Sequence, residues 1–517
     1  MKKIRPLSVV LFVTVSALAL APARAQEDSD LIGRRVLPDR PDPREIPLPA
    51  IKTNLPSLPG VNELPVRRDM PDPLIMNDGT KVTTVEQFRK RQQEIRTILE
   101  YYHVGRMPPP PGNVKGKELR SELVLDGKAR YQLIHLTFGP EEKLSLDIGL
   151  LTPTTGGLVP GVICPEYGSP PGAVQLPHLA RGPTQGRGVD ILLPPEIALA
   201  ENNQPAAPTP AARPARVAGN GNGNGNGNGG ANAEPAPAPA NRRGGDTPET
   251  FAAKHAHVIA RGYAYITFNY SDCAEDTTLR LADGSWAFRS TRFFPAYPGY
   301  DWGIVGGWAW GTMRVVDYLQ TDPLIDKTKL IVTGISRLGK AALVSGAFDD
   351  RIAMVAPVAS SGLGTPAYRF SGGPTQSTPS RGGSEGLTLM VMKYPNWFSP
   401  HLPQFWGQPD KLPYDAHWFL ALAAPRPFLL LEGTHDPNIA HIGEKKTWLG
   451  GQPAYALFGP GATDKLGIFW SDRPHAFGPG DWEALLTFAD KHLLQKTPAL
   501  PLAFNLFPAD SDTIPGN

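Results

Sequence analysis

Residues 329–343 read KLIVTGISRLGKAAL, in which a β-branched run leads through Gly334 and Ser336 into a helix-forming stretch. This pattern is the G-x-S-x-G nucleophile elbow with one additional residue before the second glycine, Gly339. The elbow holds a serine in a tight turn between a strand and a helix, so its neighbours must be small. The start of the helix directs N–H groups toward developing negative charge. The alternative is a serine that only caps the helix, which is common.

A candidate acid and a candidate base follow the serine in the order that α/β-hydrolases require. Asp436 comes after the apolar run RPFLLLEGTH, at the C-terminal end of a predicted strand, and His475 lies in the Gly/Pro loop SDRPHAFGPGD. In this arrangement His475 takes the proton of Ser336, and Asp436 holds the imidazole tautomer and stabilises the imidazolium. The alternatives are a surface histidine, one among 11, and a turn aspartate before a proline. The presence of all three residues in order favours catalysis.

A zinc site is the second interpretation of this region, since His435, Asp436 and His441 could converge on a metal. The sequence contains no H-E-x-x-H motif or similar spacing, so we expect neither a metal nor another cofactor. Cys164 and Cys273 are the two cysteines, and without clustered partners they do not make a metal site either. Export would permit a disulfide between them, but the sequence leaves open whether they meet.

The order of predicted strands and helices indicates the fold class. Before residue 200, the strand-like runs RSELVLDG, RYQLIHLTFGP and LSLDIGLLTP follow one another across short turns, which indicates an antiparallel edge. After residue 247, strands alternate with helices, as in GYAYITFNY, WGIVGGWAWGTMRVVDYLQ and KLIVTG. Such alternation is typical of a parallel sheet with helices on both faces. We therefore predict an α/β fold of the α/β-hydrolase type, a three-layer sandwich whose mostly parallel central sheet has antiparallel N-terminal strands.

The overall composition excludes some classes of partner. The chain has 517 residues and nearly balanced charge, with 51 Lys and Arg against 49 Asp and Glu. Balanced charge gives no electrostatic footprint for nucleic acid and no strong attraction to anionic membranes. A local basic pocket for one acidic substrate remains compatible with it.

Residues 1–25 have the parts of a signal peptide: a basic start, an apolar stretch and an A-x-A cleavage motif. A membrane anchor is the alternative, but the apolar stretch is short for the ~20 residues that span a bilayer. We therefore expect a secreted or periplasmic protein without membrane contact after cleavage. A Pro-rich leader at 26–75 precedes the catalytic domain at 76–499, and a tail occupies 500–517. Segment 200–247 is rich in Pro, Gly and Asn, which predicts a disordered surface insertion.

Several motifs in the same order resemble the glucuronoyl esterases, carbohydrate esterase family 15 of the α/β-hydrolase superfamily, in particular its bacterial members. GISRLGKAAL resembles the family's G-x-S-R-x-G-K elbow, and YPNWFSPHL resembles its aromatic W-F segment. LPYDAHWFLALAAPRPFLLLEGTHDP resembles the stretch before the acid loop. His475 with DWEALLTFADKHL resembles the catalytic-histidine segment and the closing helix, predicted to be capped by Asp481. The resemblance covers roughly residues 255 to 495.

The family cleaves the ester between 4-O-methyl-glucuronic acid on xylan and lignin alcohols. The resemblance therefore implies a serine carboxylesterase that acts on such glucuronate esters through an acyl-enzyme, with Ser336 as nucleophile and His475 as base. It also implies that Arg337 aids the oxyanion and that Lys340 and Glu385 bind sugar hydroxyls. One helical turn separates Lys340 from Ser336, which sets both on the same side of the elbow. The alternative for these charged residues is an ordinary solvated surface.

Three positions depart from the family pattern. Many members carry their acid as Glu 23 residues after the nucleophile, where this chain has Ala359. The acid is therefore expected at Asp436, the position that some bacterial members use. The loop after that strand carries a sugar-contacting Trp in several members and has none here, which weakens the substrate assignment. Fungal members have Cys directly before the nucleophile, where this chain has Ile335.

Other functions remain open at this point. An acetylxylan esterase or another carbohydrate esterase on the same fold is the nearest alternative, and activity on acetylated xylan alone would indicate it. A catalytically silent carbohydrate-binding protein is disfavoured because the serine, the acid and the histidine are all present. A peptidase is disfavoured because no additional propeller or lid domain is evident. We expect a monomer whose partner is glucuronoxylan or another carbohydrate ester.

Overall fold

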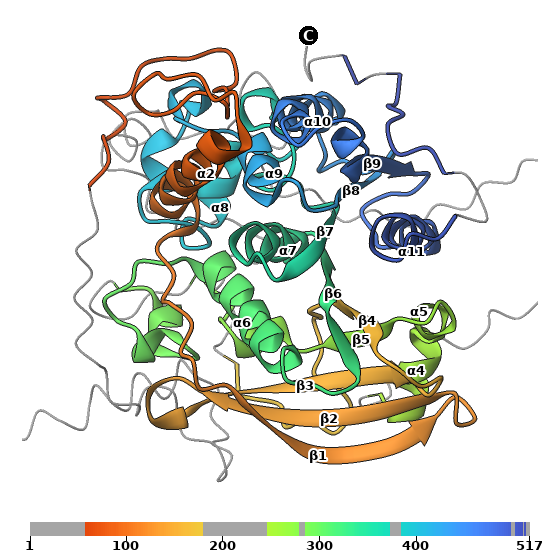
Figure 1. Ribbon diagram of the computed structural model, residues 1–517. Helices are drawn as coiled ribbons and strands as arrows, with labels where there is room; N and C mark the ends of the chain where they lie inside the picture. The colour runs from red at the N-terminus through yellow and green to blue at the C-terminus, as the bar shows by residue number, and fades with distance from the viewer. Residues whose placement is uncertain are drawn as a thin grey trace, which may run out of the picture.

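The computed structural model describes residues 57–178, 246–278, 285–372, 384–497, 502–509 and 511–512. Its strands form one sheet in the order β1-β2-β3-β5-β4-β6-β7-β8-β9 (Figure 1). The strands are β1 (Lys115–Val124), β2 (Ala129–Phe138), β3 (Leu144–Pro153), β4 (Val159–Ile163), β5 (Ala264–Thr267), β6 (Ile325–Ile335), β7 (Ile352–Val358), β8 (Phe428–Gly433) and β9 (Leu466–Ser471).

The strand directions divide this sheet into two parts. β1, β2 and β3 pair antiparallel, and β3 also pairs antiparallel with β5. From β5 through β4, β6, β7 and β8 to β9, neighbouring strands are parallel. The predicted mostly parallel sheet with antiparallel N-terminal strands is confirmed. Because parallel strands end at the same edge, side chains in the loops after β6, β8 and β9 are brought to one side of the sheet.

Helices cover both faces of the sheet, with α6 and α7 on one face and α4, α5 and α11 on the other (Figure 1). This arrangement confirms the predicted three-layer sandwich. The helices are α2 (Val85–Leu99), α4 (Pro248–Lys254), α5 (Ala256–Ala260), α6 (Ile304–Leu319), α7 (Arg337–Phe348), α8 (Leu387–Lys393), α9 (His417–Ala423), α10 (His441–Ala456) and α11 (Pro479–Leu493).

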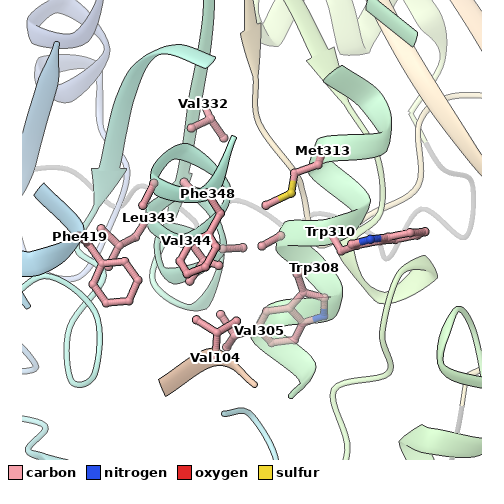
Figure 2. Close-up of a cluster of buried hydrophobic side chains, with 14 of the residues drawn as sticks. Val104, Val305, Trp308, Trp310, Met313, Val332, Leu343, Val344, Phe348 and Phe419 are labelled. Carbon is pink, nitrogen blue, oxygen red and sulfur yellow. The ribbon is translucent and has the colours of Figure 1, made fainter. Parts of the chain in front are cut away.

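Successive residues of β6 show how both faces are packed. Leu330 and Val332 belong to the buried cluster under α6 and α7, whereas Ile331 between them belongs to the cluster under α11. Side chains of a strand alternate between its two faces, so an unbroken apolar run is what a strand buried on both faces requires. Figure 2 shows the first cluster, in which Met313 of α6 points toward α7.

Some elements differ from the sequence-based expectation. The sequence patterns do not predict β7 (IAMVAPV) or β9 (LGIFWS), because such short apolar runs are compatible with strand and helix alike. The prediction that Asp481 caps the closing helix is wrong in position, because α11 begins at Pro479 after the N-cap Gly478. Asp481 instead lies in the first turn, where its carboxylate accepts the Gly478 N–H at 2.8 Å.

Part of the predicted leader is described and lies against the domain. The Val61 N–H donates to the Gln404 side chain at 3.0 Å, and the Arg67 N–H donates to the Asp410 carbonyl at 2.7 Å. The predicted signal peptide, the start of the leader and the insertion up to residue 245 lie outside the described residues.

Two open questions from the sequence concern the cysteines and the membrane. Cys164 and Cys273 are both buried and free, so they form no disulfide in this structure. In the described ranges, no helix has the length and apolar character needed to cross a bilayer.

Candidate active site

Ser336 occupies a strained turn between β6 and α7. Its backbone has φ 60° and ψ −122°, a region that a residue with a side chain adopts at a cost of about 1–3 kcal/mol. A Cβ on Gly334 would lie 2.8 Å from the Leu338 carbonyl oxygen. A Cβ on Gly339 would lie 2.8 Å from the Val358 carbonyl oxygen. Both glycines are needed for this turn, and the Ser336 side chain makes no capping hydrogen bond to α7, which argues against a capping role.

The His475 ring and the Asp436 carboxylate form a hydrogen bond, with 2.6 Å between Nδ1 and Oδ2. The Asp436 side chain is fully buried, whereas 28% of the His475 side chain is exposed. The second oxygen, Oδ1, accepts the Asn438 backbone N–H at 2.9 Å. With both of its oxygens engaged, Asp436 favours the tautomer in which Nδ1 of His475 carries the proton. Nε2 is then free to accept a proton.

The ends of parallel strands carry these three residues. Ser336 follows β6, Asp436 follows β8 and His475 follows β9. The intervening strand, β7, ends directly before Ala359, so the loop position that is acidic in many family members has no carboxylate here. The sheet thus brings to one edge the residues that were predicted from the sequence to act together.

A buried ion pair anchors the loop that carries His475. The guanidinium of Arg473 donates to the carboxylate of Asp481 through Nε at 2.6 Å and Nη2 at 3.0 Å. Arg473 also donates to the Leu431 carbonyl of β8 at 3.3 Å. Its own carbonyl accepts the His435 N–H at 3.1 Å. The loop after β9 is therefore tied both to α11 and to the acid loop after β8, which orients the imidazole.

Arg337, the first residue of α7, is held by an acid and two aromatic rings. Its guanidinium pairs with Asp276, and it lies 5.2 Å from the ring centre of Trp397 and 5.9 Å from that of Tyr167. The Trp397 indole N–H donates to the other oxygen of Asp276 at 2.9 Å. Burial lowers the pKa of Arg337, but the Asp276 carboxylate and nearby tyrosines outweigh burial and raise it overall. A fixed cation therefore stands next to Ser336 in the chain.

Lys340 is buried, with 2% of its surface exposed, so it is not part of a solvated face. Its ammonium donates to the Ser360 carbonyl and, at 3.2 Å, to the Ser361 hydroxyl. That hydroxyl donates to Glu385 at 2.8 Å, so a hydrogen-bonded chain links Lys340 and Glu385. Burial lowers the pKa of Lys340 to about 8, against the raising effect of Glu385. The Glu385 N–H donates to the Asn438 carbonyl at 3.2 Å, which ties this chain to the acid loop.

The residues of the zinc alternative have separate partners. Asp436 is engaged as described above, and His435 pairs with Asp472 at 2.8 Å on the exposed surface. The His441 ring packs edge-on against Trp470, with 4.7 Å between the ring centres. Within the part of the chain that the structure describes, no three His, Cys, Asp or Glu side chains gather as metal ligands.

The structure adds side chains that the sequence motifs do not indicate. Asp276 holds Arg337, and Ser361 connects Lys340 to Glu385. Both added residues lie in loops that follow strands of the sheet, β5 and β7. The loops after parallel strands line the sites of α/β proteins, so polar residues in them are the signal that could have indicated these side chains.

The sequence matches known esterases over most of its length. The profile of the family described as "Glucuronyl esterase, fungi" matches residues 236–459. A carbohydrate esterase from an unknown prokaryotic organism is 27% identical over 442 residues, which cover 82% of this chain and 89% of that protein. A 4-O-methyl-glucuronoyl methylesterase of Phanerochaete chrysosporium is 24% identical over 447 residues, covering 86% of this chain and 70% of that protein. The chain is therefore similar to glucuronoyl esterases.

Solved structures agree with this similarity at the level of the fold. A glucuronoyl esterase from Solibacter usitatus has a TM-score of 0.59 and 23% identity, covering 83% of this chain and 99% of that chain. A promiscuous esterase of the same family from a marine bacterial metagenome also has a TM-score of 0.59 and 23% identity, covering 84% and 98%. These structures show the α/β-hydrolase fold, and the similarity to glucuronoyl methylesterases identifies the chain as a carboxylic ester hydrolase.

Proposed function

We propose that this esterase hydrolyses esters of glucuronic acid through an acyl-enzyme on Ser336. The observation that carries the proposal is the 2.6 Å hydrogen bond between His475 and the buried Asp436, at the same sheet edge as the strained Ser336 turn. The similarity to a 4-O-methyl-glucuronoyl methylesterase supports the choice of ester. The signal-peptide pattern at 1–25 supports a site of action outside the cytoplasm.

In the acylation step, Nε2 of His475 accepts the proton of the Ser336 hydroxyl while Oγ attacks the ester carbonyl carbon. The carbonyl oxygen becomes an oxyanion, and the imidazolium that forms is stabilised by the carboxylate of Asp436. His475 then gives its proton to the departing alcohol oxygen as the C–O bond breaks. The glucuronoyl group remains bound to Ser336 as an ester.

In the deacylation step, a water molecule takes the place of the alcohol. His475 accepts a proton from this water, whose oxygen attacks the acyl carbon. The proton then passes to Oγ of Ser336 as the acyl bond breaks, which releases the glucuronic acid and restores the free hydroxyl. The partial exposure of His475 is compatible with access of water to Nε2.

The oxyanion would be stabilised from the side of α7. In α/β-hydrolases the backbone N–H of the residue after the nucleophile is one donor, and here that residue is Arg337. Its guanidinium, kept charged by Asp276, adds a positive charge near the same oxygen. One oxyanion donor contributes about 2.7–4 kcal/mol to transition-state stabilisation in other enzymes.

The buried chain of Lys340, Ser361 and Glu385 would recognise the sugar. It combines an ammonium donor with a carboxylate acceptor, the two groups that can hydrogen-bond the hydroxyls of a sugar ring. An acyl group without hydroxyls, such as acetate, cannot use these groups. The site is therefore expected to prefer a uronic acid over a simple acyl group.

The proposal is tested by acid release from benzyl glucuronate, methyl glucuronate and p-nitrophenyl acetate. Wild-type protein should hydrolyse the glucuronate esters, and Ser336→Ala should not. Ser121→Ala is the matched control, because Ser121 lies on the edge strand β1, where its hydroxyl accepts a hydrogen bond from Arg130. Turnover of glucuronate esters by Ser336→Ala would contradict the mechanism. Serine-dependent hydrolysis of the acetate alone would instead indicate an acetyl esterase.

A further inference from the structure

Two fully buried glutamates lie close to the acid loop and have no part in the mechanism above. Glu432 is in β8, four residues before Asp436, and Glu444 is in the first turn of α10. Both are 0% exposed. Burial of a single carboxylate without a partner is strongly unfavourable, so two such groups in one place need a compensating arrangement.

One threonine hydroxyl stands between the two carboxyl groups. Oγ1 of Thr365 is 2.7 Å from Oε1 of Glu444 and 3.3 Å from Oε1 of Glu432. It is also 2.7 Å from Oγ of Ser360. A hydroxyl has a single proton to donate, so it can satisfy only one of these carboxylates.

The remaining oxygens need a second proton. Oε2 of Glu432 and Oε2 of Glu444 are both buried, and neither has a hydrogen-bond partner among the described residues. A carboxylate only accepts, whereas a protonated carboxyl group both donates and accepts. A proton on one of the two groups therefore provides the missing donor.

We propose that Glu432 and Glu444 share a proton, that Glu432 carries it as the neutral acid, and that the pair is a positioning unit for Lys340 and Asp436. The effect on catalysis rests on the function proposed above, whereas the shared proton does not. The proposal concerns only the position of one proton between two carboxyl groups, so no further reactant is needed.

The electrostatics of the pair agree with this geometry. Burial raises the pKa of Glu432 well above its ordinary range and raises that of Glu444 to about 8. The charge of Glu444 raises the pKa of Glu432, and the Thr365 hydroxyl lies nearer to Glu444 than to Glu432, so Glu432 is the group that keeps the proton. The negative charge of Asp436 raises the pKa of both. With the shared proton held on Glu432, Asp436 remains the carboxylate that the mechanism requires.

Charged and titratable groups face this cluster from several elements of the fold. The groups that interact electrostatically with either glutamate are Lys340 of α7, Tyr368 after β7, Asp436 after β8 and Arg473 after β9. The ammonium of Lys340 interacts in turn with Arg337, Glu385 and His103. Arg473 lowers the pKa of Glu432, but its guanidinium is engaged by Asp481. The net effect of burial and the neighbouring carboxylates is retention of the proton.

Hydrogen bonds connect the pair to the sugar-binding side of the site. The Thr365 N–H donates to the Ser360 hydroxyl at 2.9 Å, and the Ser360 carbonyl accepts the Lys340 ammonium. The Ala367 N–H donates to the Gly443 carbonyl at 3.1 Å, which joins the same loop to α10. Ionisation of both glutamates would place like charges together beneath this loop and displace the partners of Lys340.

Four variants separate the shared proton from a structural role of the side chains. Glu432→Gln keeps a donor toward Glu444 but cannot titrate, and Glu444→Gln removes the second titrating group. Glu432→Leu has a similar volume but no donor. Glu86→Gln is the matched control, because the Glu86 side chain is 85% exposed on α2. None of these changes alters the triad.

The first measurement is the melting temperature of each protein from pH 5 to pH 8, which requires no substrate. An unfolded glutamate releases its proton near pH 4.5, whereas the folded pair retains it, so this pair makes the wild type less stable as the pH rises. The melting temperatures of Glu432→Gln and Glu444→Gln should therefore rise relative to wild type across this range. Curves parallel to those of wild type and Glu86→Gln would overturn the proposal.

The second measurement is the separation of KM from kcat for benzyl glucuronate and p-nitrophenyl acetate. Glu432→Leu should raise the KM for the glucuronate ester several-fold, with a smaller effect on the acetate, and Glu432→Gln should restore the wild-type value. Equal KM values for Leu, Gln and wild type would overturn the positioning role. If wild type did not hydrolyse glucuronate esters, the proposed function would fail, while the melting curves would still decide whether the proton is shared.

Discussion

Replacing Asp436 by asparagine should remove most of the activity and leave the fold intact. In Asp436→Asn the amide oxygen can still accept the Asn438 N–H, which lies 2.9 Å from Oδ1. The amide NH₂ group then faces Nδ1 of His475, which lies 2.6 Å from Oδ2, and donates to it. Nδ1 becomes an acceptor, so the imidazole proton moves to Nε2. That nitrogen can no longer accept the proton of Ser336.

The size of the loss follows from the burial of the acid. The Asp436 side chain is fully buried, so water cannot replace the carboxylate opposite the imidazolium. In a serine protease the same wrong tautomer lowers kcat about 10⁴-fold, which corresponds to about 5.4 kcal/mol at 1.36 kcal/mol per factor of ten. We expect a loss of about 10³- to 10⁴-fold here. The free energy of unfolding should change by only about 1–2 kcal/mol, because a neutral amide replaces the carboxylate while both hydrogen bonds are kept.

The assay is kcat/KM for benzyl glucuronate, measured together with the melting temperature. Asp472→Asn is the matched control, because the Asp472 side chain is 89% exposed and pairs with a surface histidine. It should keep wild-type activity. If Asp436→Asn retained activity within tenfold of wild type at an unchanged melting temperature, another group would have to orient the histidine, and the reasoning would be refuted.

Three further outcomes follow from the site. Lys340, with its pKa of about 8, is about nine-tenths protonated at pH 7 and about one-tenth at pH 9, so KM for glucuronate esters should rise about tenfold over that range. A flat KM profile would argue against sugar binding by this ammonium. Gly339→Ala should lower the unfolding free energy by about 1–3 kcal/mol in urea titrations, because the added Cβ meets backbone at 2.8 Å; unchanged stability would mean that the turn can relax. Arg337→Ala should lower kcat about 10²- to 10³-fold, and Asp276→Asn should lower kcat by a smaller factor. If either variant were as active as wild type, the ion pair would have no part in stabilising the oxyanion.

Local sequence patterns predicted the type of scaffold, although not strands β7 and β9. The alternation of strands and helices after residue 247 requires a parallel sheet with two covered faces, and β6 with α7 has that form. The glycines around Ser336 indicate the turn because a side chain at either one would collide with backbone. The separate motifs around Asp436 and His475 lie after strands of the same sheet, so topology alone brings them to one edge.

The partners of the site residues could not be predicted in the same way. Asp276 is 61 residues from Arg337 in sequence, and its loop has no motif that indicates this contact. The burial of Lys340 depends on the packing of the loop after β7, whereas a lysine in a helix is usually solvated. Glu432 lies inside the apolar run that predicted β8. Its proximity to Glu444 depends on where α10 packs, which the sequence does not indicate.

If Ser336 carries the acyl group during turnover, the acylated enzyme can be trapped. Wild-type protein would be mixed with excess benzyl glucuronate, quenched in acid within the first turnover and examined by intact-mass and peptide mass spectrometry. We expect a glucuronoyl adduct on the peptide that contains Ser336, and no adduct and no turnover in Ser336→Ala. Turnover by wild type with the adduct on another residue, or turnover by Ser336→Ala, would contradict it.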